Sequence, residues 1–179
     1  SVAEGFDRLI RLGVQEVQVG ILKRLRGAPI KRHVEPFEML FSPEPPYEIL
    51  RSTDWTFEEL SRMRRFARFW DMIGNSGRYS RTLELVLPSN PFMNFLAFAD
   101  WLFDFEGRTH KISMERMLKL IFTYLVDIKG LNIQTVAVAL AQDYCISTNH
   151  RRPPKFLREW VEDVTFDSDG DLSHVPERQ

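Results

Sequence analysis

Three aspartates near the end of the chain have the alternating spacing that begins a calcium-binding loop. They are Asp167, Asp169 and Asp171, in the stretch "DSDGD". Such a loop also needs glycine at its sixth position, where the chain turns sharply, and glutamate at its twelfth, which binds the ion through two oxygens. Leu172 and Arg178 stand at those positions. We therefore interpret the segment as a polar turn and not as a metal site.

A second pair of carboxylates lies one helical turn apart. Asp100 and Asp104 share the narrow polar stripe of an otherwise apolar segment with Asn94. Two carboxylates in one site could act as acid and base, but like charges at this spacing repel each other and favour a nearby cation. The candidate cations lie on an earlier predicted helix: Arg64, Arg65 and Arg68. Salt bridges between helices are therefore the favoured interpretation of both groups.

The other residues that could bind a metal or act as nucleophiles are scattered along the chain. The histidines show neither an HxxxH nor an HExxH spacing: His33, His110, His150 and His174. Cys145 is the single cysteine, which excludes an intramolecular disulfide and a CxxC metal site. We expect Cys145 to be a small buried core residue. Because a Gly-rich phosphate loop and a GxSxG motif are also missing, the sequence contains no complete catalytic site.

Composition limits the classes of partner. The chain has 179 residues, 44% of them hydrophobic, and 24 basic against 25 acidic residues give a net charge of −1. No global field attracts nucleic acid or an anionic membrane, so we expect neither as a partner. Two basic stretches, "KRLRGAPIKRH" and "HRRPPK", are local. A nucleic-acid binder that uses Arg24, Arg26 and the three arginines named above is kept as a third hypothesis.

Hydrophobic periodicity predicts a mainly α, helical bundle-like domain. Apolar residues recur at helical spacing in five stretches: 1–13, 56–73, 89–107, 113–130 and 132–146. Thr56 and Glu59 have the spacing of a capping box, and Gly107 is typical of a helix end. The 89–107 helix is apolar almost all round and is expected at the centre. A short last helix is expected after Pro154. No apolar run long enough for a membrane span and no leader-like start is visible, so we expect a cytoplasmic chain.

One stretch does not fit this helical pattern. In "VQEVQVG", residues 14–20, Val17 and Val19 alternate with Glu16 and Gln18, which predicts a half-buried strand. No other stretch predicts a strand of comparable quality. A single strand leaves backbone donors and acceptors unpaired along both edges. After it, "RGAPI" predicts a turn and the proline-rich "FSPEPPYEIL" an extended connector.

The stretch "EVQVGILKRLRGAPI" resembles the sixth barrel strand and following loop of radical S-adenosylmethionine (SAM) enzymes of the cobalamin-binding type. The resemblance continues through "PPYEIL", "RRFARFWDMIGNSGRY", "FLAFADWL" and "PPKFL", from about Gly5 to about Leu157. These motifs are similar to a C-terminal domain of unassigned function that follows the barrel in one branch of that family. Relatives are often labelled iron–sulfur oxidoreductases or anaerobic magnesium-protoporphyrin IX monomethyl ester oxidative cyclases. The partners of the predicted strand would then lie in an upstream parallel barrel.

The resemblance implies a domain organisation. Residues 1–42 would be a helix–strand–loop remnant of a truncated (β/α) barrel, and residues 43–160 the C-terminal helical domain. Residues 161–179 would form a polar tail, which we expect to be mobile.

The resemblance also implies where cofactors bind in the intact parent. The backbone of the sixth strand approaches the adenine of SAM in related barrels, which points to Val19, Gly20 and Leu22. The sequence lacks the CxxxCxxC loop that holds the [4Fe–4S] cluster, the Gly-rich SAM segment and the cobalamin domain. Ala28 stands where the usual loop tripeptide has threonine. We therefore expect no cofactor and no catalysis in this chain alone, and [4Fe–4S], SAM and cobalamin in the parent.

Two main hypotheses for the function follow. The first is an accessory domain whose partner is the upstream barrel of a radical SAM oxidoreductase, with self-association through the exposed strand as a further option. The second is a free-standing helical protein-interaction module that docks through the strand edge and the "KRLRG" turn. A self-contained module should bury Val17 and Val19 by itself, whereas a fragment should expose them or pair them with another copy.

Overall fold

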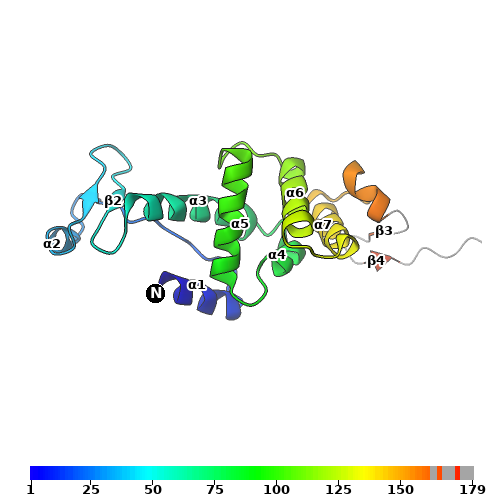
Figure 1. The fold of residues 1–179 in the computed structure, drawn as a ribbon, viewed down its shortest axis with the longest axis horizontal. Helices are drawn as coiled ribbons and strands as arrows, with labels where there is room; N and C mark the ends of the chain where they lie inside the picture. Colours follow the sequence, from blue (N-terminus) through cyan, green and yellow to red (C-terminus); the bar gives the residue numbers. More distant parts are fainter. Residues whose placement is uncertain (162–164, 167–171, 174–179) are drawn as a thin grey trace, which may run out of the picture.

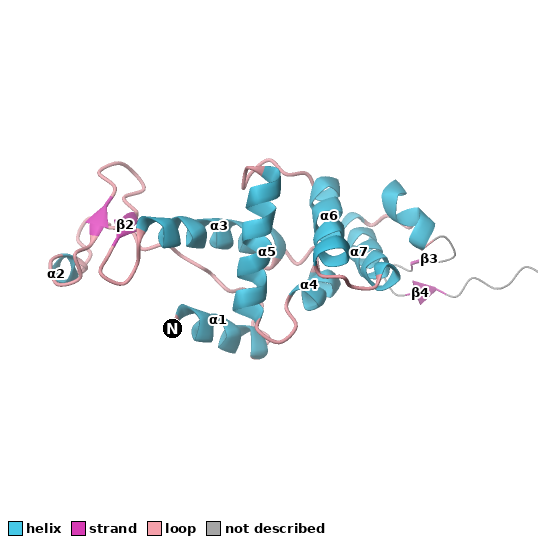
Figure 2. Cartoon of the chain, viewed as in Figure 1, coloured by secondary structure: helices cyan, strands magenta, loops and turns pink. Residues whose placement is uncertain are grey.

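The computed structural model describes residues 1–161, 165–166 and 172–173. Its elements in chain order are α1 (Val2–Arg11), α2 (Lys31–Val34), β1 (Leu40–Phe41), β2 (Ile49–Arg51), α3 (Phe57–Ile73), α4 (Ser80–Val86), α5 (Pro91–Glu106), α6 (Met114–Thr123), the π-helical turn η1 (Tyr124–Ile128), α7 (Ile133–Thr148), the 3-10 helix η2 (Lys155–Trp160), β3 (Thr165–Phe166) and β4 (Leu172–Ser173). The predicted mainly α class is confirmed (Figure 2). None of the described helices has the length and apolar character that crossing a membrane requires.

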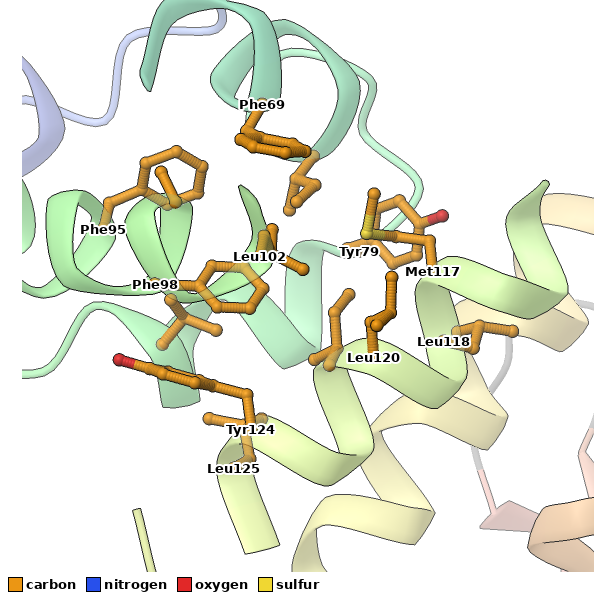
Figure 3. Close-up of a cluster of buried hydrophobic side chains, with 14 of the residues drawn as sticks. Phe69, Tyr79, Phe95, Phe98, Leu102, Met117, Leu118, Leu120, Tyr124 and Leu125 are labelled. Atoms are coloured by element: carbon orange, nitrogen blue, oxygen red, sulfur yellow. The ribbon is translucent and has the colours of Figure 1, made fainter. Parts of the chain in front are cut away.

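Helix α5 forms the centre of the molecule, as its nearly continuous apolar surface predicts (Figure 1). Helices α1 and α3 pack against one side of it, and α4 packs against it and against α7. Helices α6 and α7 complete the far end, with η2 against α7. We call α1, α3–α7, η1 and η2 the helical body. Its core is rich in aromatic rings, among them Phe95 and Phe98 of α5, and Phe98 meets Tyr124 with ring centroids 4.7 Å apart (Figure 3).

Several helix ends follow the local signals in the sequence. The Thr56 hydroxyl accepts from the Glu59 N–H, and the Glu59 carboxylate accepts from the Thr56 N–H, so the predicted capping box is confirmed. Gly107 ends α5 with a φ of 69°, a left-handed conformation that glycine adopts without strain. The first turn of α5 is capped from another helix, because the Asp7 carboxylate of α1 accepts from the Phe92 N–H at 2.7 Å.

Two apolar residues within the predicted helical stretches 56–73 and 113–130 are exposed. Ile128 is 56% exposed because α6 continues into the π-helical turn η1, whose wider turn shifts the phase of the side chains that follow. Phe57 is 53% exposed at the first position of α3. Its ring lies instead beneath the guanidinium of Arg64, at 6.0 Å.

Residues 14–55 form a second region, which we call the arm. It contains an extended segment, residues 17–22, the short helix α2 and a two-stranded antiparallel hairpin, β1 with β2. Figure 1 places the hairpin and α2 beyond the N-terminal end of α3, away from α5. The predicted connector "FSPEPPYEIL" is therefore wrong in part, because its two ends belong to the strands of the hairpin. The strands are two and three residues long, too short for a period of two to stand out in the sequence.

The end of the chain is described only in part. Strands β3 and β4 form an antiparallel pair after η2. The aspartates that we interpreted as part of a polar turn, Asp167, Asp169 and Asp171, as well as His174 and Arg178, lie outside the described residues.

Candidate functional site

The three residues implied in SAM binding lie in the extended segment of the arm. Val19 is half-buried against the core of the helical body, Gly20 is exposed, and Leu22 is 41% exposed. In Figure 2 this segment leaves the end of α1 and runs beside α3 toward the hairpin. Residues 14–20 are extended but form no strand in the described structure, because none of its strands pairs with them, so the predicted strand is not an element of this chain by itself.

Hydrogen bonds hold the extended segment at both of its ends. At one end, the Asn75 amide accepts from the Val17 N–H and donates to the Val17 carbonyl, both at 3.1 Å. At the other, an antiparallel bridge joins Lys23 to Glu48, in which Ile49 donates to the Leu22 carbonyl at 2.9 Å. Within the described part of the chain, the backbone groups of residues 18–21 between these anchors have no hydrogen-bond partner. The segment is thus a fixed, extended backbone with open edges.

The side chains of the segment alternate between two environments. Val17 is buried, and Val19 and Ile21 pack partly against the core of the body. Gln18 and Gly20 face away and are exposed. A Cβ built at Gly20 would meet nothing within 4 Å. One face of the segment is therefore covered by helices and the opposite face is open, as on a strand that has helices on only one side.

A cleft of about 340 Å³ adjoins the N-terminal end of this segment. Its apolar walls come from α1, the arm, α3 and α4, and include Ile10, Val14, Trp70 and Leu83. Polar groups of Gln15, Asn75, Ser80 and Glu84 also line it. Apolar walls with a few polar groups are typical of small-molecule sites. The described residues that line the cleft include no histidine or cysteine, and Glu84 is the single carboxylate among them.

One wall of the cleft is formed by Trp70. Its ring meets Phe6 and Phe95 edge-on, with centroids 4.7 and 4.9 Å away. Gly74 leaves room for it, because a Cβ at that position would lie 2.6 Å from the ring. The Trp70 Nε1 is buried without a hydrogen-bond partner among the described atoms. These contacts fix the tryptophan, so the cleft has a rigid wall where α1, the arm and α3 meet.

The predicted arginine and aspartate groups are used for structure. Asp100 receives a hydrogen bond at 2.7 Å from Arg62, an arginine that the prediction did not name. The expected salt bridge between helices therefore exists, with a different cation. Arg64 instead ties α3 to the hairpin, donating to Glu48 at 2.9 Å and to the Ile49 carbonyl at 2.6 Å.

The remaining members of these groups do not form a site. Arg65 lies over the Phe103 ring at 4.6 Å, and its buried Nε has no partner in the described residues. Asp104 and Arg68 are exposed. Within the described residues, Asp104 takes part in no ion pair, so the i,i+4 carboxylates of α5 do not share a cation.

Cys145 is buried, as predicted, and burial raises the pKa of its thiol. A raised pKa disfavours the thiolate that a nucleophile or a metal ligand needs. No cluster of three or more metal-binding side chains occurs in the described residues. His150 contacts the Tyr144 hydroxyl at 3.1 Å, six residues away, and not Cys145.

The sequence analysis did not single out the most buried carboxylate of the described residues, Asp143. Asp143 of α7 is 3% exposed and accepts hydrogen bonds from the Arg81 and Thr82 N–H groups at 3.1 and 2.9 Å. It thereby caps α4, a helix that was not predicted, from another part of the chain. Burial raises the pKa of this carboxyl, while the Thr82 and Arg81 hydrogen bonds favour its charged form. An aspartate inside the apolar stretch "AVALAQDYCI" was the available signal.

Comparison with known proteins adds one family. A family model described as "Protein of unknown function (DUF4080)" matches residues 35–169, which is more than half of the chain. No curated protein and no solved structure matches the sequence.

Proposed function

Because the chain belongs to the DUF4080 family, whose function is unknown, we propose a role from the geometry and from the resemblance in its motifs. The role is that of a C-terminal accessory domain in a radical SAM oxidoreductase of the cobalamin-binding type. The domain does no chemistry by itself and packs against a barrel that the parent supplies. The family model covers the region in which the resemblance places a C-terminal domain of unassigned function, and this agreement supports the proposal.

The observation that carries the proposal is the open backbone of residues 18–21. Their N–H and C=O groups have no partner in the described structure, although the segment is extended and held at both ends. Another strand can pair with an exposed backbone edge of this kind, and proteins normally cover or block such edges. Neighbouring barrel strands would satisfy these groups, except those of Gly20 that we assign to the adenine below. The half-buried Val19 and Ile21 would then face the surrounding helices, and Gln18 and Gly20 the barrel interior.

The residues present fit a role beside the adenine of SAM. The unpaired N–H and C=O of Gly20 are a donor and an acceptor of the kind an adenine edge needs, and the space beyond Gly20 is open. Val19 would contribute backbone only, because its side chain packs against the body. When bound and reductively cleaved, SAM supplies a radical that abstracts hydrogen from a substrate.

The residues do not fit an iron–sulfur cluster. The chain contains one cysteine, Cys145, which is buried in α7 and has a raised pKa. Three thiolates are needed for the family's cluster loop. The cluster and the cobalamin would therefore have to be held by the parent's other domains.

The test begins with the native reading frame upstream of Ser1. The proposal expects a CxxxCxxC loop there, and the longer protein, purified without oxygen, should show a [4Fe–4S] absorption band and reductant-dependent release of methionine from SAM. Replacing the three loop cysteines by alanine is the matched control and should abolish both signals. A longer protein without such a loop, or one that binds no cluster, would overturn the proposal.

A second candidate function is favoured by the burial of Val17. This side chain is 5% exposed, and its backbone is satisfied by Asn75, as expected of a free-standing interaction module. Such a module would offer residues 18–21 to an added strand of a partner or of a second copy. Size-exclusion chromatography with light scattering separates these cases. A dimer that is lost when the exposed Gly20 is replaced by proline, which removes an unpaired N–H, indicates self-association through this backbone. A monomer leaves the parent barrel or another protein as the partner.

A further inference from the structure

A second groove lies at the other end of the molecule, where α7 is followed by η2. It has a volume of about 790 Å³ and is open to solvent. Four side chains of its lining carry a positive charge: Arg151, Arg152, Lys155 and Arg158. Tyr144 and His150 also line it. Figure 1 places η2 beyond α7, far from the arm and its cleft. The groove is therefore separate from the site of the proposed function.

Among the described residues, no ion pair neutralises the positive charge of this groove. Its lining contains one carboxylate, Glu115, which is already paired with Lys119 at 2.8 Å. Throughout the described part of the chain, no carboxylate forms an ion pair with any of the four cations. The exposed Glu159 of η2 lies in the neighbouring groove and pairs with none of them. Four cations that have no ion-pair partner in the described structure repel one another around this groove, although the net charge of the protein is −1.

The backbone beneath these cations is fixed. Pro153 and Pro154 are buried, the Leu157 N–H donates to the Pro154 carbonyl at 3.0 Å, and the Leu157 side chain is fully buried. The Arg158 Nε–H donates to the Pro153 carbonyl at 3.1 Å. These bonds leave the terminal nitrogens of Arg158 as donors. A rigid base that presents unpaired cations loses little entropy when an anion binds.

We propose that this groove binds a compact, multiply charged phosphate, such as a pyrophosphate or triphosphate group. The planar fork of arginine matches phosphate oxygens through paired hydrogen bonds, and Lys155 adds a point charge. The contact between Tyr144 and His150, at 3.1 Å, orients the imidazole at the rim. Single-stranded nucleic acid is the less suitable ligand, because the aromatic rings among the described residues of the lining, Tyr144 and His150, meet edge to face and do not offer a row of ring faces to successive bases.

Isothermal titration calorimetry with inorganic pyrophosphate and tripolyphosphate tests the proposal on the full chain. The expected result is binding that weakens as salt rises from about 50 to about 200 mM. The double substitution Arg151→Gln with Arg152→Gln should lower the affinity by about tenfold or more. The matched control is Arg24→Gln with Arg26→Gln, which removes the same charge from a basic pocket of the arm. The control should leave the affinity unchanged.

Several outcomes would overturn the proposal. One is a lack of binding, and another is an equal loss in both double variants, which would indicate a non-specific charge effect. Binding to vesicles that contain a phosphoinositide, or to an oligonucleotide, without binding of free pyrophosphate would assign the groove to a different ligand. A third test replaces Asp167, Asp169 and Asp171 by asparagine. If this variant binds pyrophosphate and the unchanged chain does not, the chain's own carboxylates occupy the cations and the groove is not a phosphate site.

Discussion

The helical body and the arm are built from the same kinds of residue but bury them to different extents. In the body, α5 is surrounded by fully buried Phe, Leu and Met side chains. In the arm, which is described throughout, Val17 and Ile49 are the buried apolar residues, whereas six large ones are exposed: Val14, Leu22, Leu25, Phe37, Leu40 and Tyr47. Stability therefore resides in the body, whereas the arm exposes apolar side chains and unpaired backbone groups.

The largest expected effect is a truncation at the centre of the body. Phe98→Ala should lower the free energy of unfolding by about 3–5 kcal/mol, because it empties a fully buried site between Phe95 and Tyr124. Leu40→Ala is the matched change in the arm, where the side chain is 49% exposed, and should cost about 0.5 kcal/mol or less. Urea unfolding followed by far-UV circular dichroism measures both.

A similar loss in the two variants would break the comparison, because the arm would then be part of the cooperative core. If Phe98→Ala does not fold, Phe98→Leu leaves a smaller cavity and keeps the test available.

The next largest effect concerns the tie between α7 and α4. Asp143→Ala should cost about 1–3 kcal/mol, since it leaves the buried N–H groups of Arg81 and Thr82 without their acceptor. Asp143→Asn keeps one carbonyl oxygen and should recover part of the loss. Hydrogen exchange resolved by residue should show faster exchange in α4 than in α5. A uniform change across the body would mean that Asp143 stabilises the whole fold and not this helix.

Alkaline pH should lower the free energy of unfolding by about 1 kcal/mol through Tyr79, a buried residue of the body. Burial raises the pKa of Tyr79 to about 12 from an ordinary value of 10. Between these values the folded state holds a proton that the unfolded state has lost, so stability falls as pH rises above about 10, by about 1 kcal/mol at pH 11. Urea unfolding at pH 9 and pH 11 measures the loss. Tyr79→Phe should reduce it, whereas Tyr47→Phe in the arm should leave it in place.

Separating the arm from the body should have a smaller effect on global unfolding. Arg64→Ala removes the hydrogen bonds to Glu48 and to the Ile49 carbonyl that hold the hairpin against α3. We expect a loss below about 1 kcal/mol in global stability, because the ion pair is partly exposed. Amide exchange in β2 should nevertheless become faster while exchange in α5 stays the same. Unchanged exchange in β2 would show that Arg64 is not what holds the hairpin.

The same contrast explains how far the sequence could predict the structure. Helices α3 and α5 were predicted well, because a capping box, a left-handed glycine and a long apolar face are local signals. Helix α4 was missed because it is seven residues long and depends on Asp143, which lies 61 positions beyond Thr82. The arm was harder still, since its order depends on two contacts distant in sequence, Asn75 with Val17 and Arg64 with Glu48.

The candidate site was predicted only as a location. Alternation in "VQEVQVG" correctly indicated an extended segment with Val17 buried, yet no local pattern contains the Asn75 clamp or the cleft beside Trp70. The basic stretch "HRRPPK" was visible, but whether its charges were paired depended on where Glu115 and Lys119 fold. The sequence shows directly which residue stands at each position. Which partner a charged side chain or a backbone hydrogen-bonding group finds depends on how distant parts of the chain fold together.

The smallest expected effect is at Gly20, and it sharpens the comparison most. Gly20→Ala should change the free energy of unfolding of this chain by no more than about 0.5 kcal/mol, because the added Cβ meets nothing within 4 Å and the residue has no positive φ. In the longer radical SAM protein that we propose as the parent, the same methyl group would stand on the open face where we place the adenine, and SAM affinity should fall. Equilibrium dialysis with SAM measures that loss. Gln18→Ala is the control, because it lies on the same face two residues earlier and removes atoms instead of adding them. A destabilised isolated chain would mean that the open face is already occupied by this chain, whereas unchanged SAM affinity in the parent would remove Gly20 from the site.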